Sequence, residues 1–144
     1  MLGLVSAPAI GERYEAVRDG GARLNGEPIH VSRADRISRS FILYSGLEDW
    51  LTGPHWAPFR QLVSEARRSR GFGDFWGHML VARGAADAMM EAELATWDWA
   101  AAQVVVEEAG GRMTTFDGSP LSDTCSVLTT NGALHDELIA RLRG

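Results

Sequence analysis

The chain has 144 residues, enough for one domain with a sizeable core, and 45% of them are hydrophobic. Its formal net charge of −5 argues against a general binder of nucleic acid or anionic membranes, because such proteins gather Lys and Arg against phosphates. The one basic cluster, Arg67-Arg68-Ser69-Arg70, is too short to reverse this conclusion. Composition therefore predicts neither a nucleic-acid partner nor a membrane partner.

Cysteine usage and the N-terminal segment bear on location. The single cysteine, Cys125, cannot form an internal disulfide, so a reducing cytoplasm is the expected location. No apolar run approaches the ~20 residues of a membrane span. The opening residues are apolar but lack the basic region and the long apolar core of a signal peptide.

Residues 1–32 predict an antiparallel meander. Strands are expected at 2–6, 13–17 and 29–31, and the first of them is expected to be buried. Two turn signals separate the strands, Asp19-Gly20-Gly21 and Asn25-Gly26, and the second is a strong hairpin cue. Such a meander needs another layer to cover its apolar face.

After Ser32 the pattern changes to strands that alternate with helices, which is typical of a sheet covered by helices. Strands are expected at 41–44, 88–92, 112–116 and 127–130, helices at 57–68, 75–82 and 135–142, and a compact loop at 70–74. Residues 33–144 are therefore predicted to form an α/β subdomain with a mixed sheet and flanking helices.

The segment 96–111 is central to the prediction of function. A helix is expected after Thr96, whose hydroxyl can cap the free N–H groups of the first turn. Apolar residues at 97, 100, 101, 104 and 105 keep the spacing of one buried stripe, and Gly110-Gly111 supplies the positive φ of a helix end. Asp98 then lies in the first turn, where it complements the helix dipole or takes part in a site.

Four acidic residues are candidates for chemistry: Asp74, Glu91, Glu93 and Asp98. Carboxylates grouped near a helix N-terminus suit a hard cation such as Mg²⁺, which prefers oxygen ligands. The alternative is that they lie on a solvated face, and that Asp74 caps a helix beginning at 75. The four histidines show no ligand spacing with one another or with Cys125, which leaves a zinc site little support.

Two stretches resemble one enzyme family. The motif Trp97-Asp98-Trp99-Ala100-Ala101, followed by a β-branched run and Glu108-Ala109-Gly110-Gly111, is similar to the second signature of the inositol monophosphatase family, the magnesium-dependent phosphomonoesterases. Ala102 stands where that signature often has glycine. The opening is similar as well, through Gly3-Leu4-Val5, Pro8, Gly20-Gly21-Ala22, Asn25-Gly26 and Val31-Ser32. The resemblance runs from Gly3 to about Leu142.

The resemblance implies an α/β fold of alternating layers, the αβαβα sandwich of the family, of which this chain would be the C-terminal half. The meander would then belong to the central sheet of the larger fold. It also implies a homodimer and hydrolysis by a metal-activated water that attacks phosphorus in line. It places Asp98 on a Mg²⁺ ion, and Glu91, seven residues earlier, on the hydroxyl groups of the substrate. Glu93 is interpreted as a solvated side chain.

The loop Arg70-Gly71-Phe72-Gly73-Asp74 and the stretch Leu80-Val81-Ala82-x-Gly84-x-x-Asp87 resemble the histidinol-phosphatase branch of the family more than its inositol branch. Histidinol phosphate carries an ammonium and an imidazole with which Asp74 can pair, whereas inositol offers only hydroxyl groups. Arg70 is a candidate contact for a phosphate or for a substrate held by a neighbouring subunit, and the alternative is a surface arginine.

The family's other metal ligands lie in Gly-Glu-Glu and Asp-Pro-x-Asp-Gly-Thr motifs, neither of which occurs in these 144 residues. The expected function is Mg²⁺-dependent hydrolysis of histidinol phosphate, a small phosphomonoester, with this chain supplying the substrate side and one metal ligand. An inositol or sugar phosphatase is one alternative, and a short non-catalytic binding or assembly module is another. Because the meander would lack its sheet neighbours, Leu2, Val5 and Ile10 are expected to be exposed and to drive self-association.

Overall fold

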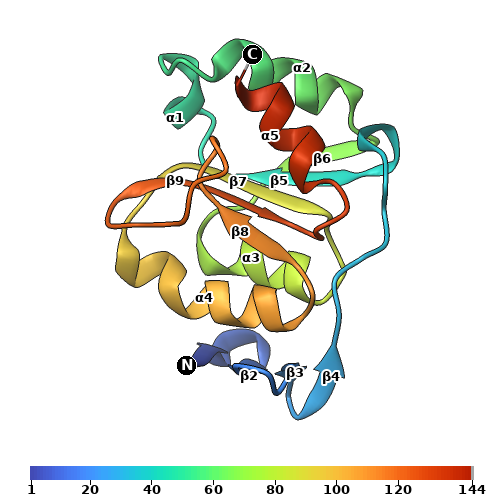
Figure 1. Cartoon of the computed structure of the whole chain (residues 1–144), viewed down its shortest axis with the longest axis vertical. Coiled ribbons are helices and arrows are strands. Elements are labelled where there is room, and N and C mark those ends of the chain that lie inside the picture. The colour runs from blue at the N-terminus through green and yellow to red at the C-terminus, as the bar shows by residue number, and fades with distance from the viewer. Residues whose placement is uncertain (144) are drawn as a thin grey trace.

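Four layers alternate along the molecule: a small sheet, a pair of helices, a larger sheet and a second group of helices (Figure 1). The computed structural model describes residues 1–143. The layered α/β fold predicted from the sequence is confirmed. Among the described residues, no helix combines the length and the apolar character that crossing a membrane requires.

The small sheet is the antiparallel meander that the turn signals predict. Its strands β1 (Leu2–Ala7), β2 (Glu12–Val17), β3 (Ala22–Leu24) and β4 (Glu27–Ile29) pair in chain order. A 3₁₀ turn, Pro8–Ile10, joins β1 to β2. Between β3 and β4, Asn25 and Gly26 have φ values of 51° and 87°, the positive values that their sequence predicts.

The larger sheet is mixed. Its strands are β5 (Phe41–Tyr44), β6 (Arg68–Gly71), β7 (Ala88–Leu94), β8 (Arg112–Thr114) and β9 (Cys125–Thr130), in the spatial order β6-β5-β7-β9-β8. Strand β5 lies parallel to β6 and β7, whereas β9 lies antiparallel to β7 and β8. The three parallel strands therefore end at the same edge of the sheet.

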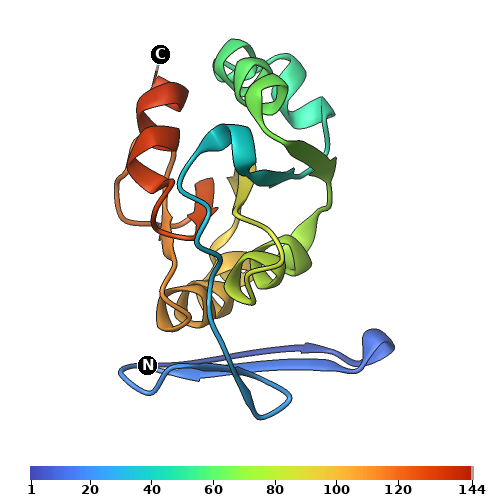
Figure 2. The ribbon, with the colours of Figure 1, turned by 90° about the vertical axis from the view of Figure 1, so that its right-hand side faces the viewer.

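Helices cover both faces of this sheet (Figures 1 and 2). On one face lie α1 (Glu48–Leu51), α2 (Trp56–Glu65) and α5 (His135–Arg143), and on the other lie α3 (Asp74–Ala82) and α4 (Thr96–Glu108). A second 3₁₀ turn, Ile37–Arg39, precedes β5. The meander packs against α4 on the side away from the larger sheet.

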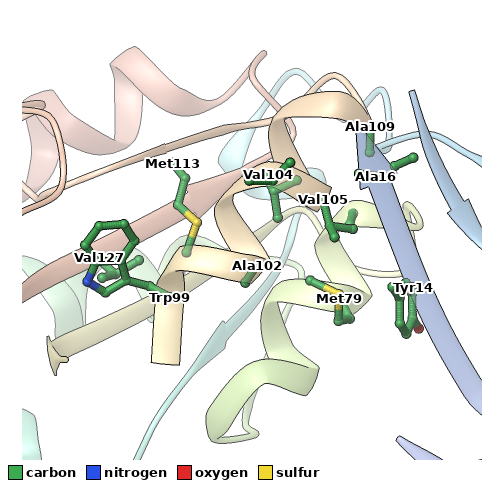
Figure 3. Packing of buried hydrophobic residues seen from close by; sticks show 13 residues of the cluster. Tyr14, Ala16, Met79, Trp99, Ala102, Val104, Val105, Ala109, Met113 and Val127 are labelled. Carbon is green, nitrogen blue, oxygen red and sulfur yellow. The ribbon is translucent and has the colours of Figure 1, made fainter. Parts of the chain in front are cut away.

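Helix α4 is buried on two sides. The apolar cluster around it includes Tyr14 and Ala16 from the meander, Met79 from α3, and Met113 and Val127 from the larger sheet (Figure 3). The predicted single stripe that begins at position 97 is wrong, because Trp97 is 82% exposed whereas Trp99 is buried. A helix enclosed between two layers buries more than one stripe, so its periodicity does not identify the covered face.

Strand β1 approaches α4 so closely that glycine is required at position 3. A Cβ atom on Gly3 would stand 2.6 Å from the carbonyl oxygen of Ala101 and 2.9 Å from the Cβ of Val104. Only the face of β1 that contacts α4 is covered. The prediction that residues 2–6 form a buried strand is therefore wrong, and Leu2, on the other face of β1, is 68% exposed.

Two local predictions fail at element ends. Helix α4 begins at Thr96 itself, with Ala95 as its N-cap, and the Thr96 hydroxyl donates to a carbonyl outside the helix. Residues 70–74 are not one compact loop, because Arg68–Gly71 forms β6 beside β5. The arginines of β6 break the apolar alternation that marks a strand. The positive φ expected after α4 is confirmed at Gly110, with 92°.

Candidate active site

Residues from separate connections meet at the edge of the larger sheet where its parallel strands end. The segment 72–74 follows β6, and the segment 95–98 follows β7. Ligands of α/β proteins commonly bind at this edge, because the loops that leave neighbouring strands lie side by side there. Asp74, Glu91 and Asp98 thus come from three different elements to one edge of the sheet.

A hollow of about 450 Å³ lies among β1, α3 and α4, and we call it the acidic hollow. Two of its lining residues are carboxylates, Asp74 from α3 and Asp98 from α4. The remaining lining residues are apolar: Leu4, Val5, Phe75, Leu94, Trp97, Ala101 and Ala102. The acidic hollow therefore combines two negative side chains with an apolar wall.

Asp98 lies in the first turn of α4, as predicted. Its carboxylate is exposed and has no ion-pair partner within residues 1–143, and the helix N-terminus favours a carboxylate there by about 0.3–1 kcal/mol. Such a group fits one oxygen ligand of Mg²⁺. Within the same residues, no group of three or more Asp, Glu, His or Cys is placed to hold a metal ion. Asp98 therefore fits one position in the coordination shell of a metal ion and not a complete site.

Asp74 is the first residue of α3 and has a φ of +61°. Gly73 is the N-cap and no side chain caps this helix, so the prediction that Asp74 caps a helix beginning at 75 is wrong. The left-handed conformation costs a residue with a Cβ atom about 1–2 kcal/mol, although Asp tolerates it better than most. Residues held in such conformations cluster at binding and active sites. The backbone of Asp74 therefore supports a role for its side chain in the acidic hollow.

Glu91 lies on β7 with 3% of its surface exposed. Its Oε1 atom has no hydrogen-bond partner among the described residues, which is uncommon for a buried carboxyl oxygen. Burial raises the pKa of Glu91 to about 7, and the nearby Ser45 hydroxyl opposes this rise. The negative charges of Asp74, Asp49 and Asp98 raise the pKa of Glu91 further. At neutral pH Glu91 therefore exists in both protonation states and can accept or donate a hydrogen bond.

Asp49 has no signal in the sequence that marks it as part of this site. It lies on the short helix α1, and an acidic first turn there is also what a solvated helix shows. Its charge nevertheless acts on Glu91. Asp49 and Glu93 line a second cavity, of about 510 Å³. Glu93 is exposed, as its interpretation as a solvated side chain predicts.

Arg70 is not brought to the acidic hollow within this chain. It lies on the edge strand β6, and its guanidinium donates to the carbonyl of the adjacent Ser69 at 2.7 Å. The residues that line the acidic hollow do not include it. A contact between Arg70 and a substrate held by a neighbouring subunit stays a prediction.

The comparisons with known proteins agree with this architecture. The model of the inositol monophosphatase family matches residues 1–144. Histidinol-phosphatase of Streptomyces coelicolor is 41% identical to the chain, over 99% of the chain and 55% of that protein. Histidinol-phosphatase of Chlorobaculum parvum is 38% identical, over 98% of the chain and 55% of that protein. The chain thus spans about half the length of the curated relatives it matches.

A solved structure shares the fold. The inositol monophosphatase from Anabaena (Nostoc) sp. PCC 7120 matches with a TM-score of 0.89 and 31% sequence identity, over 99% of this chain and 58% of that one. The family match extends over every residue of the chain, and the sequence relatives and the fold point to the same family. The chain belongs to the inositol monophosphatase family.

Proposed function

We propose that this chain supplies the substrate side and one metal ligand of a Mg²⁺-dependent phosphomonoesterase that hydrolyses histidinol phosphate. The two relatives described above, both named histidinol-phosphatase, support this substrate. The observation that carries the proposal is the pair of carboxylates, Asp74 and Asp98, that line one hollow with buried Glu91 close to both. In this proposal the meander belongs to the central sheet of the larger family fold.

Electrostatics explain why a metal ion and a cationic substrate suit the acidic hollow. A phosphate group is repelled by carboxylates, so an unassisted phosphomonoester would bind poorly there. Mg²⁺ held by Asp98 would offset this repulsion, and when bound it supplies a Lewis acid and an activated water. The ammonium of histidinol phosphate is attracted by the same carboxylates that repel its phosphate.

The three acidic residues and the apolar wall of the hollow would then have different roles. Asp98 would hold the metal ion, and Asp74 would pair with the ammonium in a charge-assisted hydrogen bond. Glu91, whose Oε1 has no partner among residues 1–143, would accept a hydrogen bond from a polar hydrogen of the substrate. The apolar wall that includes Phe75 and Trp97 would exclude water from the organic part of the substrate.

Two alternative functions make different predictions. Inositol phosphate is the first, and it draws on the solved inositol monophosphatase that shares the fold. Its ring offers hydroxyl groups only, so it leaves the charge of Asp74 without a cationic partner. A non-catalytic binding or assembly module is the second, and it predicts ligand binding that does not depend on Mg²⁺.

Phosphate release measures the proposed activity directly. Because this chain supplies one metal ligand only, the assay combines it with a segment that carries the family's Gly-Glu-Glu and Asp-Pro-x-Asp-Gly-Thr motifs. In the presence of Mg²⁺ we expect release from histidinol phosphate to exceed release from inositol 1-phosphate, measured with a colorimetric phosphate assay. Asp98→Asn should lower the rate by about a hundredfold or more, because the metal's stabilisation of the transition state is worth several kcal/mol. Failure of the wild-type chain to release phosphate in this combined assay, together with Mg²⁺-independent binding of histidinol phosphate, would contradict the proposal in favour of the non-catalytic module.

The raised pKa of Glu91 predicts a pH-dependent stability. The ordinary pKa is 4.5, and in the fold it is about 7, so between these values the folded chain binds more protons than the unfolded chain. The stabilising contribution of protonated Glu91 is complete below pH 4.5 and is lost as the pH rises through about 7. Glu91→Gln should therefore remove on the order of 1–3 kcal/mol of pH dependence from the free energy of unfolding, measured by urea denaturation.

Glu93→Gln is the matched control for this measurement, because Glu93 lies on the same strand but is exposed. It should keep the wild-type pH profile. A Glu91→Gln variant whose stability varies with pH as the wild type's does would show that Glu91 is not the titrating group.

The open face of the meander predicts self-association, in line with the homodimer that the family resemblance implies. Leu2 and Ile10 are exposed as expected, whereas Val5 is half-buried. Val17, the cross-strand neighbour of Leu2, is 52% exposed, and β1 is an edge strand of the small sheet in the described part of the chain. We expect the chain to sediment as a dimer or larger species, and the double change Leu2→Lys and Val17→Lys to shift it towards monomer.

Leu51→Lys provides a matched control for the meander variant. Leu51 is 53% exposed on α1, which lies at the opposite end of the molecule from the meander (Figure 1). This variant should sediment as the wild type does. A wild-type chain that sediments as a single monomeric species would refute the proposed association.

A further inference from the structure

A single carboxylate links the meander to α3. Glu12, at the start of β2, accepts hydrogen bonds from the Tyr14 hydroxyl at 2.7 Å, from the Trp76 indole N–H at 3.3 Å and from Arg83 at 2.5 Å. Tyr14 belongs to the same strand, but Trp76 and Arg83 lie 64 and 71 residues away in the chain. The Glu12 side chain is only 16% exposed, so these bonds are shielded from water.

The two distant partners of Glu12 lie at opposite ends of α3. Trp76 is in the first turn of the helix, and Arg83 is its C-cap residue. One oxygen, Oε2, accepts from Trp76, and the other, Oε1, accepts from Arg83. Glu12 therefore fixes α3 at both ends and sets its position along the meander.

Hydrogen bonds lower the pKa of Glu12. Burial on its own would raise the pKa of Glu12, but the bonds from Tyr14, Arg83 and Trp76 and the charge of Arg83 outweigh it and leave the pKa below its ordinary value. The acceptor that holds α3 is thus a carboxylate, and hydrogen bonds to a carboxylate are stronger than those to a neutral group.

The attachment of α3 to Glu12 bears on the backbone of Asp74, which lies two positions before Trp76. Its left-handed backbone, with φ of +61°, persists only where the surroundings hold it in place. On one side the N–H of Phe72 donates to the carbonyl of Tyr44 at 2.9 Å, which fixes the end of β6. On the other side the Trp76 ring meets the Phe72 ring edge to face, with centroids 5.3 Å apart, and its N–H reaches Glu12.

We propose that Glu12 is a positioning residue of the substrate site: through Trp76 it holds the first turn of α3 and thereby keeps Asp74 in the strained conformation that presents its carboxylate to the acidic hollow. The part of this inference that concerns substrate rests on the proposed function. The meander thus contributes to ligand recognition through a contact that lies outside the hollow, because Glu12 does not line it.

Glu12→Gln tests the inference, since it removes the charge and retains the size of the side chain. Amide hydrogen exchange should rise about tenfold across residues 72–76, as expected for loss of a charged hydrogen bond, and should stay unchanged in β9. Trp76→Phe keeps the ring against Phe72 but removes the N–H, so it should produce a smaller increase over the same residues. Glu15→Gln is the matched control. Glu15 lies on the same strand with its side chain 39% exposed and pairs with Arg13, so this change should leave exchange at residues 72–76 unaltered.

The backbone strain supplies a readout that a general loss of stability would not reproduce. Glycine adopts positive φ without cost, so an Asp74→Gly chain no longer needs the attachment to hold this conformation. In that background Glu12→Gln should change exchange at residues 72–76 much less than it does in the wild type. Equal effects in both backgrounds, or an equal rise of exchange in β9, would overturn the inference.

Calorimetric titration separates this inference from the proposed function. Glu12→Gln should weaken binding of histidinol phosphate several-fold and leave binding of inorganic phosphate unchanged, because only the former engages Asp74. If the wild-type chain binds no histidinol phosphate while the exchange results hold, the proposed substrate is wrong and the positioning of Asp74 by Glu12 stands. Unchanged affinity of Glu12→Gln for a ligand that the wild type does bind would contradict the positioning role.

Discussion

The enclosure of α4 between the meander and the larger sheet is the interaction on which the rest of the structure depends. Apolar side chains from both layers converge on this helix, and burial of each large one contributes about 1.5–3 kcal/mol (Figure 3). Gly3 permits the contact on the meander side, because any Cβ there would strike the Ala101 carbonyl. With α4 held on both sides, its first turn and Asp98 have a fixed place beside α3 and β7. The geometry of the acidic hollow is therefore a consequence of core packing.

Three carboxylates lie in or next to the acidic hollow, and a cation bound there would neutralise part of their charge. Asp74 and Asp98 are exposed in the hollow without ion-pair partners in the described part of the chain, and Glu91 is buried close to both with a free oxygen. Leaving carboxylates unpaired near one another costs free energy, which a cation recovers when it binds. The strained backbone of Asp74 adds to this cost. Both costs fit a site selected for binding and not for stability of the chain alone.

Local signals in the sequence predict much of this arrangement, but they do not predict the contacts between layers. The Asn25-Gly26 turn and the place of Asp98 in a first turn follow from short-range rules, and both are confirmed. The stripe that included Trp97 fails because tertiary contacts on two sides of α4 decide what is buried. Strand β6 is not predicted, because its arginines break the apolar alternation that marks a strand. The contact of Glu12 with α3 has no local signature, since Trp76 and Arg83 lie more than sixty residues away in the chain.

Binding of histidinol phosphate to an Asp74→Asn chain tests the central claim, that the fold places a carboxylate at Asp74 to receive a cationic phosphomonoester. Asparagine tolerates positive φ, so this variant removes the charge and keeps the backbone. In calorimetric titrations with Mg²⁺, we expect affinity for histidinol phosphate to fall about tenfold, the loss expected for one charge-assisted hydrogen bond, while affinity for inorganic phosphate stays unchanged. Equal affinity of wild type and Asp74→Asn for histidinol phosphate would contradict it.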